Sequence, residues 1–228
     1  MTFHEQLARA TAVDRDFLLA APVIQRCLTG DVTRETYVAF LTQAYHHVRH
    51  TVPLLMAVGA RLPDRHRWLQ PAVLHYLEEE AGHDEWILND IAQAGGDRVA
   101  AAASEPAIAT EAMIAYAYDT VTRRNPLGFF GMVHVLEGTS VALALTAADR
   151  IQQTLGLPTR AFTYLRSHGE LDKEHVNDLA AILARLTEAE DREAVIRCAR
   201  GIYWLYGQVF RSLDSAVAAV PEPQRRIA

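Results

Sequence analysis

Cysteine is scarce in this sequence. Only Cys27 and Cys198 occur among 228 residues, and neither has the close, paired spacing of a cysteine-based metal site. Two isolated cysteines are typical of ordinary buried thiols in a reducing compartment. We therefore assign them no chemistry.

Clusters of positive charge are also missing. The 22 Lys and Arg residues are scattered among 28 Asp and Glu residues, which gives a net charge of −6 and no basic face for nucleic acid. The first residues lack the basic start and apolar run of a signal peptide, and we find no stretch that approaches the roughly 20 apolar residues of a membrane span. We expect a cytoplasmic protein without membrane or nucleic-acid partners.

Alternating runs of β-branched residues, which would indicate strands, are absent as well. Apolar residues instead recur at three- and four-residue intervals, which predicts an all-α fold in a single domain, 1–228. Turn and capping signals divide it into about seven helical segments. These segments are 3–28 (an irregular pair), 33–61 with a kink at Pro53, 64–95, 105–123, 126–155, 159–185 and 191–218.

Three of these segments carry side chains that suit a metal site. They hold Glu80-x-x-His83, then Glu137, then the run that contains His168, Asp172 and His175. A helix turns by about 100° per residue, so side chains three, four or seven residues apart lie within about 60° of one another around its axis. Three imidazoles and three carboxylates exceed the needs of one ordinary site, so the set favours a dinuclear carboxylate site.

Glu137 is the strongest single indication, because the run from Met132 to Gly138 has little else that is polar except His134. A buried glutamate needs a partner. The alternatives are ordinary ones: Glu-x-x-His pairs occur by chance on solvated faces, and Asp172 could pair with a histidine in a charged surface stretch.

Several other residues compete for a place at the site. His134 could be a ligand or a hydrogen-bond donor to one, and Glu79 could replace Glu80 because both spacings keep two groups on one face. The histidines near residue 47 could instead lie on a solvated helix face. The aromatic residues at helical spacing could instead belong to the hydrophobic core. The candidates for supporting the ligands or contacting substrate are His134, Glu79, Tyr45, His47, Tyr76 and Tyr206.

Nitrogen and oxygen donors without thiolate favour iron or manganese over structural zinc. Two divalent cations and three carboxylates would leave about one positive charge to attract an anionic group or reduced dioxygen. Oxidation is the reaction class that this indicates.

The order and spacing of these motifs resemble those of the haem-oxygenase-like non-haem diiron oxidases and oxygenases, over about residues 30–215. The resemblance implies a TenA-like helical bundle, with Glu80 and Glu137 bridging two Fe ions and His83, His168, Asp172 and His175 as terminal ligands. The Glu80-x-x-His83 spacing is similar to that of fatty-acid decarboxylases that form terminal alkenes. Other members place their first glutamate where this chain has Tyr76.

The resulting hypothesis is a dioxygen-activating, iron-dependent oxidoreductase, with manganese as the alternative metal. Its expected partners are dioxygen and a small, carboxylate-bearing substrate; a homodimer is considered, and the electron donor is unidentified. The alternatives are a metal-free, TenA-like protein that binds a small ligand and a cofactorless, quinone-forming type of oxidase.

Overall fold

The computed structural model describes residues 1–218, and the side chains of 170–174 and 214–218 lie outside that description. Within this part the secondary structure is helical, without strands. The all-α class predicted from the sequence is confirmed. The α-helices are α1 (Phe3–Ala10), α2 (Ala12–Leu19), α3 (Pro22–Thr29), α4 (Arg34–Val48), α5 (Thr51–Arg61), α6 (Gln70–Glu80), α7 (His83–Gln93), α8 (Arg98–Ala103), α9 (Ile108–Arg123), α10 (Phe129–Leu155), α11 (Thr163–Ala184) and α12 (Ala189–Ala218).

Short 3-10 helices precede three of these α-helices. They are η1 (Asp64–Leu69), η2 (Pro126–Gly128) and η3 (Thr159–Ala161). The expectation of about seven helices was therefore wrong, because several predicted segments are divided. Where the sequence predicted a kink at Pro53, the helix instead ends at Val48, and a new helix begins at Thr51. Pro53 lies in the first turn of α5, where backbone N–H groups have no partner within the helix, so its missing N–H costs no hydrogen bond.

The break between α6 and α7 matters most for function. Ala81 is extended, and Gly82 has φ of 89°, a left-handed conformation that glycine adopts without the steric penalty of a side chain. Glu80 ends one helix and His83 begins the next. The prediction of one continuous helix over 64–95, with both ligands on one stripe, was wrong.

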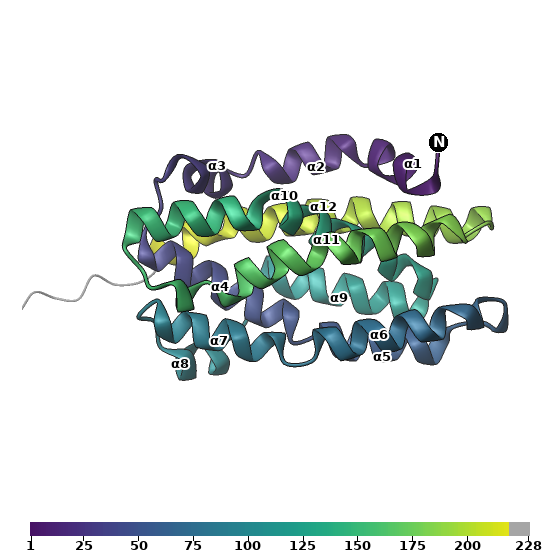
Figure 1. Ribbon diagram of the computed structural model, residues 1–228, viewed down its shortest axis with the longest axis horizontal. Coiled ribbons are helices and arrows are strands. Elements are labelled where there is room, and N and C mark those ends of the chain that lie inside the picture. Colours follow the sequence, from purple (N-terminus) through teal and green to yellow (C-terminus); the bar gives the residue numbers. More distant parts are fainter. Residues whose placement is uncertain (219–228) are drawn as a thin grey trace, which may run out of the picture.

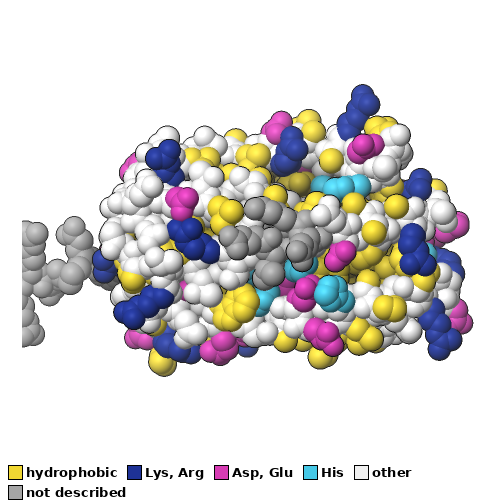
Figure 2. Space-filling model, viewed as in Figure 1, with side chains coloured by type: hydrophobic (Ala, Val, Ile, Leu, Met, Phe, Trp, Pro, Cys, Tyr) yellow, Lys and Arg dark blue, Asp and Glu magenta, His cyan; other side chains and the backbone are white. Residues whose placement is uncertain are grey.

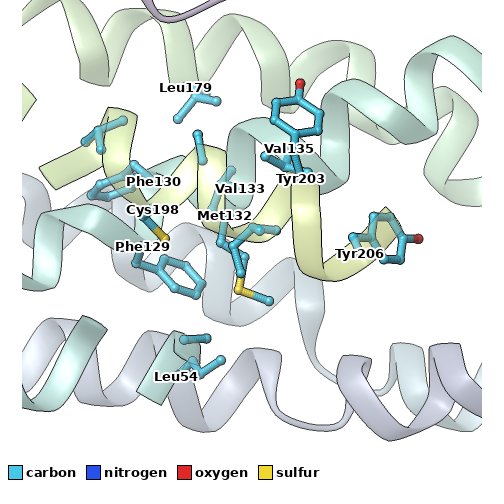
Figure 3. Close-up of a cluster of buried hydrophobic side chains, with 14 of the residues drawn as sticks. Leu54, Phe129, Phe130, Met132, Val133, Val135, Leu179, Cys198, Tyr203 and Tyr206 are labelled. Carbon is cyan, nitrogen blue, oxygen red and sulfur yellow. The ribbon is translucent and has the colours of Figure 1, made fainter. Parts of the chain in front are cut away.

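Helices α10, α11 and α12 form the centre of the molecule (Figure 1). Helices α1 to α3 lie along one side of this layer, and α5 to α7 lie along the opposite side (Figure 1). Apolar side chains such as Phe130, Val135 and Leu179 fill the space between the elements (Figure 3). The central layer thus brings α10 and α11, which carry Glu137 and His168, against each other.

The long apolar segment Pro126–Leu155 contains η2 and α10. By length and composition it could cross a bilayer, which the sequence analysis overlooked, but 67% of its most apolar window is buried inside the protein. Its apolar surface is accounted for by packing against neighbouring helices, as in a core helix.

Candidate metal centre

Three of the predicted ligands come together from three different helices. Glu80, His83 and His168 each offer a ligand atom, and these atoms lie within 4.8 Å of one another. His83 Nδ1 lies 3.1 Å from Glu80 Oε2, and the rings of His83 and His168 meet edge to face with centroids 4.8 Å apart. His83 is only 1% exposed. This arrangement is a compact nitrogen and oxygen site of the size that one ion occupies.

The turn at Gly82 creates the first half of this group. The left-handed conformation of Gly82 turns the chain, and this brings Glu80 at the end of α6 within hydrogen-bond distance of His83 at the start of α7. Glu80 and His83 are therefore close to each other because of a turn between two helices, and not because they share one helical stripe.

A second group of similar chemistry contains His175, Glu79 and Glu137. His175 Nε2 lies 2.7 Å from Glu79 Oε2, and its Nδ1 lies 3.5 Å from Glu137 Oε1. Glu137 is 8% exposed and His175 is buried. Glu79 and Glu80 were predicted as alternatives for one position. The structure places one in each group.

Asp172 lies outside the residues whose side chains are described, so its role as a ligand stays a prediction. His134 is buried on α10 but meets the rings of His4 and Tyr203, which lie on α1 and α12. Tyr45 packs in a separate core cluster and contacts Arg49. Neither His134 nor Tyr45 belongs to the two ligand groups.

A cavity of about 170 Å³ adjoins the ligand groups. Glu80, Glu137 and His168 line it, and so do three of the substrate-contact candidates, His47, Tyr76 and Tyr206. The rest of the lining is largely apolar and comes mainly from α3, α4, α5, α10, α11 and α12. Among the described lining residues there is neither lysine nor arginine. Figure 2 shows histidine and acidic side chains gathered in the middle of one face of the molecule.

One wall of this cavity, on α10, was not predicted from the sequence. Ser140, Ala144 and Ala147 follow Glu137 toward the C-terminus at helical spacing, and all three line the cavity. Small side chains on the same stripe as a buried glutamate were the signal that could have revealed it.

Burial sets the protonation of two polar groups at the cavity. Burial, followed by the charge of Glu137, raises the pKa of Tyr76, so its phenol stays protonated. Burial, followed by the charge of His168, lowers the pKa of His47 to about 3. Both side chains therefore face the cavity in neutral form at physiological pH.

The donor set fits iron. Carboxylate and imidazole donors without thiolate are typical ligands of iron and manganese. A carboxylate such as Glu137 in an apolar helix is unfavourable unless cations or donors surround it. A metal ion in each group would supply that compensation.

Comparison with known proteins agrees with this fold and donor set. The family described as iron-containing redox enzymes, of haem-oxygenase-like type, matches residues 38–207. The chain belongs to this family. No curated protein matches the sequence.

Solved structures share the fold at low sequence identity. A domain of unknown function with a haem-oxygenase-like fold from Shewanella denitrificans is 24% identical, with a TM-score of 0.86. The match covers 100% of this chain and 99% of that domain's chain. A TenA homologue from P. horikoshii is 10% identical over 93% and 98% of the two chains, with a TM-score of 0.76. Haem oxygenase-1 from Synechocystis, solved with haem, is 13% identical over 96% and 95%, with a TM-score of 0.72.

Proposed function

We propose that the protein is a non-haem diiron oxidase or oxygenase that uses dioxygen to oxidise a small, largely apolar substrate. The observation that carries the proposal is the pair of adjacent carboxylate and histidine groups at the wall of one apolar cavity. Membership of the iron-containing redox family supports iron as the metal.

Glu80, His83 and His168 would hold one ion, and His175 with Glu79 and Glu137 would hold the other, with Asp172 as a further ligand. An iron pair, when bound, supplies the electrons that reduce dioxygen. The hydrogen bond that now joins His83 to Glu80, and the one that joins His175 to Glu79, fix the orientation of these donors before an ion arrives.

The cavity determines which substrates can reach this wall. Its apolar lining excludes water and favours an apolar body. A substrate carboxylate, as we expect from the sequence, would have to face the metal ions because the described lining offers no cationic side chain. Tyr76 presents a protonated hydroxyl at the same cavity, beside the ring of His175 at a centroid distance of 5.5 Å.

A metal-free protein that binds a small ligand is the second candidate. It is favoured by one observation: Glu137 Oε1 lies 3.5 Å from His175 Nδ1, so a histidine of the protein already faces this buried carboxylate. TenA homologues are among the proteins that share the fold.

Reaction with dioxygen separates the two candidates. Protein loaded anaerobically with two equivalents of Fe(II) is mixed with oxygenated buffer, and dioxygen consumption and visible absorbance are followed. We expect rapid consumption and a transient absorbance that a Zn(II)-loaded control lacks. Binding of two Fe(II) without any reaction with dioxygen would favour the ligand-binding protein.

A further inference from the structure

His47 is a buried histidine whose polar atoms are not satisfied by the protein. It is 3% exposed, and within the described part of the chain neither ring nitrogen has a hydrogen-bond partner. Its ring meets that of Tyr206 in a T-shaped arrangement at a centroid distance of 5.7 Å. Buried polar groups in native proteins are nearly always hydrogen-bonded, so an unpaired imidazole calls for an explanation.

The neighbouring histidines of the same helical region do not share this property. His46 is also 3% exposed, but its Nε2 lies 2.9 Å from Ser104 Oγ. His50 Nδ1 lies 3.1 Å from the hydroxyl of Tyr118. The chain thus satisfies the imidazoles on either side of His47, while His47 itself lines the cavity.

A second unpaired group lines the same cavity. The hydroxyl of Tyr76 is buried without a hydrogen-bond partner among the described residues, and its ring contacts His175. Two unpaired polar groups at one apolar cavity indicate that a ligand supplies the missing partners.

The chemistry of the cavity restricts this ligand. The lining follows α10 from Phe129 to Ile151, which is about 33 Å of helix, so the space favours an elongated apolar body. His47 is neutral, and a neutral imidazole carries one donor and one acceptor nitrogen. Such a group suits an uncharged hydroxyl or carbonyl, because it brings no charge to balance an anion.

We propose that His47 is a substrate-positioning residue, whose imidazole hydrogen-bonds to an uncharged hydroxyl or carbonyl group of an elongated apolar substrate in this cavity. The identity of the reaction that this substrate undergoes rests on the proposed function. Binding of the substrate by His47 is independent of it, because binding requires the cavity and not the metal.

Binding to metal-free protein tests this directly. Affinities of 1-decanol and decane are measured by displacement of the neutral fluorophore N-phenyl-1-naphthylamine from chelator-treated wild type and His47→Leu. Loss of one hydrogen bond should weaken 1-decanol binding about ten-fold and leave decane binding unchanged or slightly tighter. His47→Gln, which keeps a donor and an acceptor, should restore part of the affinity for the alcohol.

Thermal stability supplies the second readout. A leucine in place of an unpaired imidazole should raise the melting temperature of the ligand-free protein, because a buried polar group without a partner is removed. The matched control His46→Leu should lower the melting temperature by removing the bond to Ser104, and should leave 1-decanol affinity at the wild-type level.

Three outcomes would overturn the proposal. The first is an equal loss of affinity for 1-decanol and decane in His47→Leu. The second is a lower melting temperature with both affinities unchanged, which would make His47 structural. The third is loss of iron binding in His47→Leu, which would make it a metal ligand. Failure of the iron proposal alone would leave the measurements on metal-free protein intact.

Discussion

Replacing His168 with alanine is expected to lower the affinity for Fe(II) by at least about 100-fold, because even partners outside the ligand sphere contribute 10- to 100-fold. The substitution removes one of the three donors that lie within 4.8 Å of one another. His175→Ala should have the same effect on the second group, where that imidazole lies between Glu79 and Glu137. Each variant should therefore retain at most one tightly bound iron.

Iron per chain is measured by elemental analysis after anaerobic loading and gel filtration, and affinity by competition with a chelator. His46→Ala is the matched control, because His46 is a buried histidine that lies outside both ligand groups and outside the cavity lining. It should keep the wild-type iron content. Wild-type iron in both His168→Ala and His175→Ala would show that these groups do not hold the metal.

Gly131→Ala is expected to destabilise the fold on the order of 3 kcal/mol or more, the upper range for overpacking. A Cβ at this position would overlap the carbonyl oxygen of Val195 and lie 2.8 Å from the backbone nitrogen of Ala199. Both atoms belong to the backbone of α12, so no side-chain rotation relieves the clash. The contact holds α10 against α12 next to the segment that carries Glu137.

Gly138→Ala on the same helix is the control for this prediction. A Cβ there meets nothing within 4 Å, so the substitution should stabilise the protein by about 0.5–1 kcal/mol through the lower helix propensity of glycine. Urea unfolding followed by circular dichroism measures both variants. Equal stability of Gly131→Ala and wild type would show that α10 and α12 are not in backbone contact here.

The sequence was enough to predict the all-α class and to bring Glu80, His83 and His168 into one hypothesis, because helical periodicity and ligand chemistry are local signals. It did not reveal the break at Gly82, because a glycine within a helical pattern has the same local signature whether or not φ is positive. The apolar periodicity continues across Gly82, so it predicted one helix where the structure has α6 and α7.

The remaining errors have tertiary causes. His134 and Glu137 are one turn apart, and the sequence cannot show that the former meets His4 and Tyr203 while the latter approaches His175. The role of Glu79 was likewise hidden, because only the position of α11 brings His175 to it. Residues from seven helices line the cavity, so no single segment of the sequence describes it.

The most direct test of the central claim is X-ray diffraction from crystals of the iron-loaded protein, recorded on both sides of the iron absorption edge. The account predicts two peaks of iron anomalous density at the cavity wall, one among Glu80, His83 and His168 and the other beside His175 and Glu137. Iron density elsewhere in the molecule, or none at these two groups in protein shown to contain iron, would contradict it.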